Sequence, residues 1–346
     1  MNDEFQPRKI LVIRFSSLGD VVLSTAVLPN LKARFPEASI SVLTKALYAP
    51  LFENNPSVDQ VLVFDPQKKP FAQLIREMRE NRFDIILDLH QNFRSWLIRF
   101  FSGPPIGMTL HKYNWARRKL ILFKEASPQL IPSVRERMLE TLKKIDVPLI
   151  NEETQLFPRD PKKVLGSFSI DSGARLIGIA PGAQHHSKRW SPERFAEAAN
   201  HLAQKAEAMV LLLGDKNDRD AAQRILPLLK VPAKDLIGLT SIPELVAIIS
   251  RLSFLLTNDS GLLHVGEALK VPLVALFGPT VRAFGFAPYR STSKVVEVEG
   301  LQCRPCSLHG NDKCPLGHHR CMDDIDLTSV LTASFPLLGH PGGTSR

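Results

Sequence analysis

The chain has 346 residues, of which 44% are hydrophobic, and this is enough apolar material for the cores of two ordinary domains. No uninterrupted apolar run approaches the ~20 residues that a membrane-spanning helix needs, and residues 1–8 are too polar for a signal peptide. We therefore expect a two-domain, soluble, cytoplasmic protein, and an integral membrane protein is excluded.

The net charge of +9 is concentrated in the first half of the chain. Residues 68–137 contain 14 Lys and Arg against 6 Asp and Glu, interleaved with aromatic side chains. Such a stretch is either a solvated basic face or a surface for an acidic partner, namely an anionic lipid, an acidic acceptor or a nucleic acid. No helix–turn–helix, zinc-finger or ribonucleoprotein signature occurs, so we expect no nucleic acid. Arg94 is the candidate acceptor-binding residue within this stretch.

Short apolar runs alternate with helical patterns along the first half of the chain. The helical patterns begin at residues 20–34, and the predicted strands lie at residues 9–15, 39–44, 60–64 and 84–88. This alternation predicts βα units around a parallel sheet. Residues 147–163 have three prolines and no sustained periodicity, so we place a linker there.

The alternation restarts after the linker and predicts a second parallel sheet. The predicted strands are 176–180, 209–213, 252–257 and 272–277, and the predicted helices are 195–206, 219–229, 243–250, 261–269 and 326–338. We expect an α/β fold of two Rossmann-like doubly wound domains that face each other across a cleft, at residues 1–160 and 161–325. Residues 326–346 form a C-terminal helix and tail, a candidate to cross back onto the first domain. Such domains bind ligands at the carboxyl ends of their strands.

Two strand–turn–helix segments are candidate anion sites. Residues 258–264 read Asn-Asp-Ser-Gly-Leu-Leu-His, and residues 16–20 read Ser-Ser-Leu-Gly-Asp. A glycine-containing turn that opens a helix leaves backbone N–H groups without intrahelical partners, and these attract an anion. Asp20, in the first helical turn, is placed as a general base, although an ordinary helix-capping Asp fits the same position. The absence of G-x-G-x-x-G argues against a dinucleotide-binding loop.

Two more polar segments follow predicted strands. In residues 181–190, Gly182 permits close backbone approach, and Lys188 and Arg189 bring positive charge for a phosphate. The adjacent histidines His185 and His186 could suggest a metal site. However, neighbouring residues do not share a helix face and no third ligand is evident, so we expect no metal there. Asp218 follows another strand, where a carboxylate either binds ribose hydroxyls or is simply solvated.

Four cysteines lie close together near the end of the chain, at Cys303, Cys306, Cys314 and Cys321. Their spacing, C-x2-C-x7-C-x6-C, resembles a zinc knuckle, but the second pair lacks the short spacing of most structural zinc sites. Structural zinc, reduced thiols and partly disulfide-bonded staples all remain open. In each case we expect an architectural role.

Four segments carry a resemblance to a known family: residues 10–22, 181–183 with 188–190, 258–264 and 277–280. In this order they resemble the ADP-heptose:lipopolysaccharide heptosyltransferases, the inverting glycosyltransferase family 9 with the GT-B fold. Residues 314–322 are similar to the tail of the second heptosyltransferase of the pathway. The resemblance implies transfer of heptose from ADP-L-glycero-D-manno-heptose to the inner core of lipopolysaccharide, on a heptosyl-Kdo-lipid A acceptor, with no cofactor required.

By motif position, the resemblance implies that Asp20 is the catalytic base and that Lys188 neutralises the departing diphosphate. The implied donor-binding residues are Ser17, Gly19, Gly182, Asp218, Asp259, Ser260, Gly261 and His264. The implied partner is an acidic lipid-linked oligosaccharide, with peripheral contact at the cytoplasmic face of the inner membrane. The alternatives are a non-catalytic GT-B-fold protein that binds an acidic glycolipid or nucleic acid, and a dinucleotide-dependent oxidoreductase.

Overall fold

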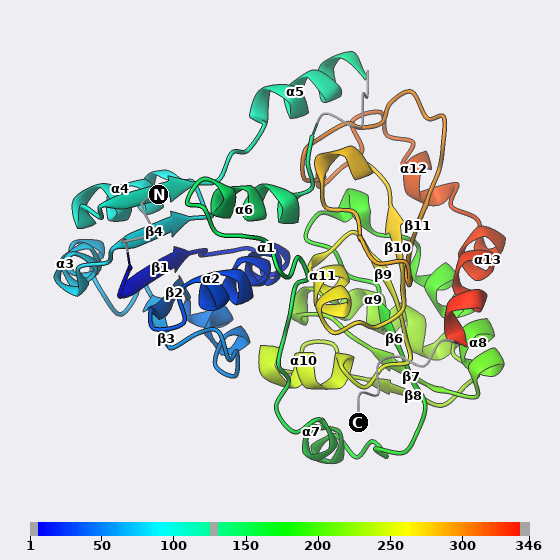
Figure 1. The fold of residues 1–346 in the computed structure, drawn as a ribbon. Helices are drawn as coiled ribbons and strands as arrows, with labels where there is room; N and C mark the ends of the chain where they lie inside the picture. Colours follow the sequence, from blue (N-terminus) through cyan, green and yellow to red (C-terminus); the bar gives the residue numbers. More distant parts are fainter. Residues whose placement is uncertain (1–5, 125–130, 340–346) are drawn as a thin grey trace. The chain divides into compact units, whose positions relative to one another are not determined.

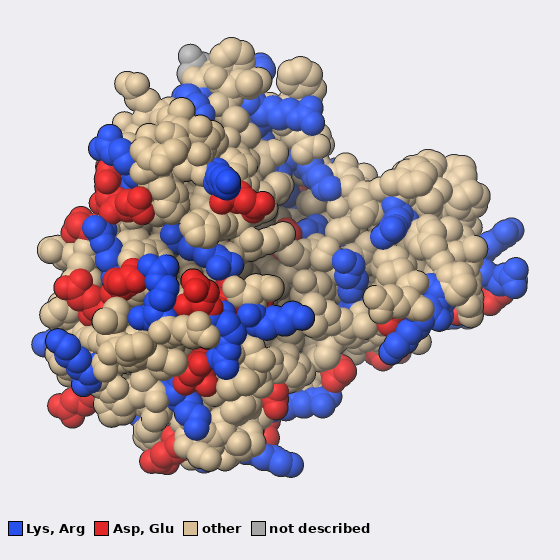
Figure 2. Space-filling view, turned by 180° about the vertical axis from the view of Figure 1, so that it is seen from behind, with Lys and Arg blue, Asp and Glu red and all other residues tan. Residues whose placement is uncertain are grey.

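The computed structural model describes residues 6–124 and 131–339, and their contacts divide into two units (Figure 1). The first unit contains residues 6–112 and 134–157, and the second contains residues 113–124, 131–133 and 158–339. Lys and Arg side chains gather over the face of the first unit that Figure 2 shows. No helix among the described residues is long and apolar enough to cross a membrane.

The first unit is built on a five-stranded parallel sheet with the order β3-β2-β1-β4-β5. Its strands are β1 (Lys9–Ile13), β2 (Ser39–Lys45), β3 (Gln60–Phe64), β4 (Ile85–Asp88) and β5 (Ile106–Thr109). The central strand β1 pairs with β2 and β4 and is buried from Ile10 to Ile13, as expected for a parallel strand covered on both faces. The four predicted strands are confirmed, whereas the edge strand β5 was not predicted.

The helices of the first unit are α1 (Leu18–Ser24), α2 (Leu28–Arg34), α3 (Phe71–Asn81), α4 (Phe93–Ser102) and α6 (Val134–Lys143), with 3₁₀ helices η1 (Thr25–Val27) and η2 (Ala46–Leu51). The single helix predicted over residues 20–34 is therefore wrong, because it is divided at η1. Pro29 has no N–H to continue the ladder. The hydroxyls of Ser24 and Thr25 also bond back to the carbonyls three residues earlier, which favours a tighter turn.

The second unit is built on a six-stranded parallel sheet with the order β11-β10-β9-β6-β7-β8. Its strands are β6 (Leu176–Ala180), β7 (Met209–Leu212), β8 (Ala233–Asp235), β9 (Phe254–Asn258), β10 (Leu273–Phe277) and β11 (Ser293–Glu297). The four predicted strands are confirmed, and all of them lie inside the sheet. The two edge strands, β8 and β11, are only partly buried, so their sequences lack a continuous apolar run.

The helices of the second unit are α5 (Asn114–Phe123), α7 (Pro161–Ser167), α8 (Pro192–Ala206), α9 (Arg219–Ile225), α10 (Ile242–Ile249), α11 (Gly261–Ala268), α12 (Arg320–Asp323) and α13 (Leu327–Leu338). Short 3₁₀ helices lie at η4 (His186–Lys188), η5 (Lys216–Asp218), η6 (Leu226–Leu228) and η7 (Arg282–Phe284). Helix α8 shows why these boundaries arise. The Ser191 side chain accepts a hydrogen bond from the Arg194 N–H, and Pro192 occupies the first turn, where its missing N–H costs nothing.

The contacts place α5 in the second unit, whereas the sequence-based division assigns residues 1–160 to the first domain. The Arg117 guanidinium lies 5.7 Å from the centroid of the Phe284 ring, and Lys124 donates to the carbonyls of Cys303 and Pro305. Helix α13 packs against α8, β10 and β11 of the same unit. The crossing back of the tail stays a prediction, because residues 340–346 lie outside the described residues.

The tight packing of β6 can be tested at Gly178. A Cβ added there would lie 2.5 Å from Leu252 Cδ1 and 3.0 Å from Leu255 Cδ1. We expect Gly178→Ala to lower the free energy of unfolding by about 1–3 kcal/mol. The matched control is Gly166→Ala in α7, where nothing lies within 4 Å of the added Cβ and stability should rise by about 0.5–1 kcal/mol. Urea denaturation of both variants checks this, and equal effects would contradict it.

Candidate active site

The carboxyl edge of the first sheet holds a carboxylate in an ion pair. Oδ2 of Asp20, in α1, lies 2.7 Å from an Nη atom of Arg14, which directly follows β1. The same oxygen accepts the Ser17 hydroxyl at 3.1 Å and the Ser17 N–H at 3.4 Å. Arg14 is anchored in turn, because it donates to the Leu89 carbonyl. Asp20 therefore caps α1 and is also held at the sheet edge, so the helix-capping interpretation and the site interpretation both describe its geometry.

His90, just after β4, belongs to the same edge and was missed from the sequence. Its ring lies 4.9 Å from the Phe15 ring, and its buried Nδ1 has no hydrogen-bond partner among the described residues. Burial lowers the pKa of His90 to about 4, and the nearby charges of Arg14 and Lys112 act in the same direction. The imidazole is therefore neutral near pH 7. The sequence contains one signal that could have identified His90, namely the polar residues that directly follow the strand predicted at 84–88.

Tyr48 is a second residue that the sequence did not single out. Burial raises the pKa of its phenol, and the negative charge of Asp20 raises it further. Tyr48 lies in η2, after β2, so this edge collects groups from three neighbouring strands.

The remaining residues predicted in the first unit lie close to this edge. Ser17 is the N-cap of α1 and Gly19 is buried within that helix. Arg94 is exposed on the first turn of α4, with its guanidinium 5.9 Å from the centroid of the Phe64 ring. The Phe64 ring in turn lies 5.0 Å from the ring of Phe15. The donor and acceptor roles of these three residues stay predictions.

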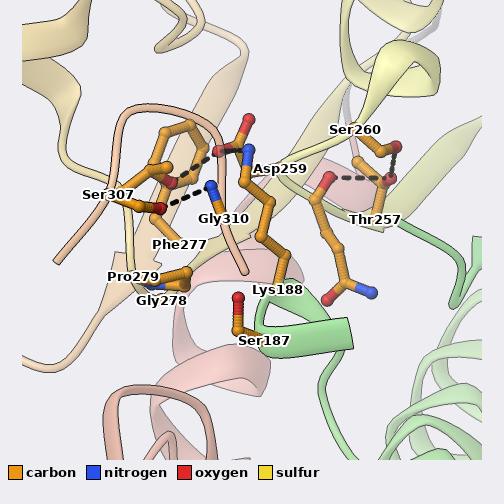
Figure 3. Close-up of polar contacts among 12 residues, drawn as sticks. Ser187, Lys188, Thr257, Asp259, Ser260, Phe277, Gly278, Pro279, Ser307 and Gly310 are labelled. Carbon is orange, nitrogen blue, oxygen red and sulfur yellow. Dashed lines mark hydrogen bonds and ion pairs between the residues drawn. The ribbon is translucent and has the colours of Figure 1, made fainter. Parts of the chain in front are cut away.

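The carboxyl edge of the second sheet holds a buried ion pair between Lys188 and Asp259 (Figure 3). Nζ of Lys188, in η4, lies 2.7 Å from Oδ2 of Asp259, which directly follows β9. The Thr280 hydroxyl, after β10, donates to the same oxygen at 2.6 Å. Lys188 and Asp259, which the sequence analysis found in two separate motifs, are thus in direct contact.

The start of α11 lies directly beside this ion pair in the chain. Ser260 is the N-cap, its hydroxyl lies 3.2 Å from that of Thr257, and Gly261 is the first helical residue. His264 is buried within the helix, with its ring 6.2 Å from the Phe286 ring. An eight-residue helix presents the N–H groups of its first turn, so this end can bind an anion.

Asp218 is a buried carboxylate rather than a solvated one. Its Oδ1 lies 3.2 Å from an Nη atom of Arg189, and its Oδ2 accepts the Asp215 N–H at 3.1 Å. Burial raises the pKa of Asp218, with a smaller contribution from Asp215, while Arg189 and the Asp215 N–H oppose the shift. A Cβ on Gly182 would lie 2.1 Å from Asp218 Oδ2. Gly182 therefore makes room for this carboxylate, in addition to any contact with a ligand.

A loop that follows β11 holds the segment that carries Lys188. The Ser187 N–H donates to the Asn311 carbonyl at 3.0 Å, and the Asn311 N–H donates to the Ser187 hydroxyl at 2.8 Å. A Cβ on Gly310, whose φ is +101°, would lie 2.8 Å from the Cβ of His185 and 3.2 Å from Cε of Lys188. Residues 307–311 therefore fix the position of η4.

The four cysteines lie around this loop without disulfide bonds between them, and their roles as a zinc site or as disulfide staples stay predictions. The Cys306 N–H donates to the Pro279 carbonyl. Burial raises the pKa of Cys321 to about 12, and the charges of Cys306, Cys303 and Cys314 also raise it, with Arg304 opposing. Within residues 6–124 and 131–339, no group of three or more His, Cys, Asp or Glu side chains is arranged to hold a metal ion.

Two units that are each built on a parallel α/β sheet are the architecture of the GT-B glycosyltransferases, and the solved heptosyltransferase structures that this chain resembles share it. The chain belongs to glycosyltransferase family 9, the heptosyltransferases, whose family model matches residues 71–315.

Three known proteins show how far this similarity extends. The chain is 30% identical to lipopolysaccharide heptosyltransferase 2 of Escherichia coli K12, over 95% of this chain and 98% of the relative. The solved structure of E. coli ADP-heptose LPS heptosyltransferase II has a TM-score of 0.75 at 28% identity, covering 95% of this chain and 98% of that one. E. coli heptosyltransferase WaaC shares the fold, with a TM-score of 0.61 at 18% identity, covering 87% and 95%. The predicted GT-B fold and transferase class are confirmed.

The space at Gly182 gives a direct test of the Asp218 site. We expect Gly182→Ala to weaken ADP binding by about tenfold or more, because the added methyl displaces the Asp218 carboxylate from Arg189. Isothermal titration with ADP measures the effect. Gly173→Ala is the matched control, since its Cβ would meet only the side chain of Asp171 at 3.5 Å. Unchanged affinity in a folded Gly182→Ala protein would contradict the assignment.

The lowered pKa of His90 predicts how stability depends on pH. The unfolded chain binds a proton near pH 6.5, whereas the folded chain does so only near pH 4, so stability is lost as the pH falls between these values. After allowance for partial exposure, we expect a loss on the order of 1–2 kcal/mol at about pH 4.5. His90→Gln removes this contribution. Urea midpoints of both proteins across the pH range check it, and parallel curves would contradict it.

Proposed function

We propose that the chain transfers a heptose, with inversion, from ADP-L-glycero-D-manno-heptose to the inner core of lipopolysaccharide, on a heptosyl-Kdo-lipid A acceptor. The relative at 30% identity is named lipopolysaccharide heptosyltransferase 2, and WaaC has been solved with ADP and with ADP-2-deoxy-2-fluoro heptose. The observation that carries the proposal is the buried Lys188–Asp259 pair beside the start of α11, a combination suited to a sugar diphosphate.

The donor is assigned to the second unit. Its diphosphate binds the N–H groups of Ser260, Gly261 and the residues after them, and it competes with Asp259 for the Lys188 ammonium. Asp259 retains the hydrogen bond from Thr280 when Lys188 turns to the phosphate. As the bond to the anomeric carbon breaks, Lys188 and the helix start stabilise the negative charge that develops on ADP. Asp218 is assigned to the ribose hydroxyls, and His264 supports the turn from within α11.

The base is assigned to the first unit. Asp20 accepts the proton of an acceptor hydroxyl, which attacks the anomeric carbon as ADP leaves from the opposite face. Arg14 and Ser17 hold the carboxylate in one orientation, so little rearrangement is needed. The neutral imidazole of His90 adds no charge that would compete with Arg14 for Asp20.

The acceptor is a lipid-linked oligosaccharide that bears acidic groups, and Arg94 is proposed to bind it. The excess of basic residues in the first half of the chain supports such a partner. We also propose a cytoplasmic location with peripheral contact at the inner membrane, where this acceptor is anchored. Membership of a transferase family favours catalysis over the non-catalytic and oxidoreductase alternatives.

The role of Asp20 is testable with an isosteric variant. We expect Asp20→Asn to lower kcat by about 10²–10⁴-fold, because the amide cannot accept the acceptor proton, while the ADP affinity stays within about twofold. Release of ADP from ADP-heptose in the presence of the acceptor measures turnover.

The matched control is Asp59→Asn. Asp59 also forms an ion pair in the first unit, with Lys32 at 3.2 Å, but it lies just before β3, at the opposite edge of the sheet. Its variant should retain turnover. Near-normal transfer by a folded Asp20→Asn enzyme would show that another group is the base. Salt-sensitive acceptor binding without turnover in the wild type would favour the non-catalytic alternative.

A further inference from the structure

Helix α4 presents a row of large aromatic side chains to solvent. Phe93, Trp96, Phe100 and Phe101 are 73%, 42%, 62% and 50% exposed, whereas Ser95 and Ile98 on the other face are buried. We call these four side chains the aromatic ridge. Single exposed apolar residues are common on proteins, but a contiguous group of this size marks a surface that binds something.

The aromatic ridge is an ordered surface. The rings of Phe93 and Trp96 stack with centroids 6.0 Å apart, and those of Trp96 and Phe100 stack at 5.2 Å, because positions three and four apart share a helix face. The helix beneath is anchored to the sheet, since the Ser95 hydroxyl donates to Asp88 at 2.9 Å and Asn92 caps the first turn. The rings are therefore presented by a fixed scaffold.

Basic side chains accompany the aromatic ridge. Arg94 is exposed on the same helix, and α3, which packs against α4, carries exposed Arg76 and Arg79. The acidic Glu77 of α3 is neutralised by Lys69 at 2.7 Å. Blue side chains prevail over red ones on the first unit in the view of Figure 2. The exposed Glu80 of α3 is outnumbered by these three arginines, so the surface that α3 and α4 form carries a net positive charge and attracts anions.

We propose that the aromatic ridge docks the first unit onto an anionic lipid bilayer. Trp and Phe side chains favour the boundary between lipid headgroups and acyl chains, and each Arg near an anionic surface adds to the attraction. A second copy of this chain fits less well, because it would bring two positively charged surfaces together. The purpose of the docking rests on the proposed function, since the acceptor there is lipid-anchored, but lipid binding is measured without turnover.

Sedimentation with vesicles tests the docking. We expect the full chain to bind vesicles that contain phosphatidylglycerol far better than pure phosphatidylcholine, with binding weakened by salt. Replacing Trp96 and Phe100 together by Ser should weaken binding by about tenfold or more per ring. The matched control is Leu47→Ser, which removes a 62% exposed side chain of the same unit outside α4 and should change binding less than about twofold.

Quenching of tryptophan fluorescence by brominated lipid locates the contact. The chain has three tryptophans, of which Trp190 is buried and Trp115 is exposed on α5. Trp96→Phe keeps an apolar ring and should retain vesicle binding while losing the quenching. Trp115→Phe should retain both.

Three results would overturn the proposed docking of the aromatic ridge onto a bilayer. Normal vesicle binding by the folded double variant would show that the aromatic ridge is not the contact, and quenching lost only in Trp115→Phe would assign it to α5. Self-association that the double variant abolishes would identify a second copy as the occupant.

The double variant should also transfer heptose normally to an acceptor without its lipid. Vesicle binding in a chain that never turns over would refute the proposed function and leave the docking intact.

Discussion

Parallel pairing of the strands is the constraint on which the rest of this structure depends. Each strand pair among the described residues runs parallel, so the carboxyl ends of neighbouring strands meet at one edge of each sheet. In the first unit this edge collects Arg14, Asp20 and His90. In the second it collects Lys188, Asp218 and Asp259. Polar groups that are far apart in the chain thereby become neighbours, while the apolar interiors of the strands are covered and buried.

Three carboxylates at these edges have their charge compensated by a cation. Asp20, Asp218 and Asp259 each form an ion pair with a cation, and each also accepts a hydrogen bond from a neighbouring N–H or hydroxyl. A buried ion pair adds little net stability, because desolvation offsets most of the attraction. The three largely buried pairs at these sheet edges therefore add little to stability by their charges, and the proposed function gives them a role in binding a charged substrate. In the proposed function, a diphosphate competes with Asp259 for Lys188 at the second edge.

Much of the fold could be predicted from the sequence, and the reason for each miss is physical. The buried central strands β1 and β9 have continuous apolar runs, whereas β5, β8 and β11 are only partly buried and show no such run. The break at η1 depends on Pro29 and on two hydroxyls that bond backwards, which hydrophobic periodicity does not detect. The candidate carboxylates were found because they follow strands, and His90 follows one as well. Its significance appears only through burial and the charge of Arg14.

The sequence by itself determined the two parallel α/β sheets, most of their strands and the turns that bear Asp20, Lys188 and Asp259. These features are set by local periodicity and by residues next to one another in the chain. Only the tertiary structure decided which cation pairs with which carboxylate, that Gly182 makes room for Asp218, and that residues 307–311 fix η4. Lys188 and Asp259 are 71 residues apart, and such a contact is fixed by the packing of whole strands and loops rather than by any local pattern.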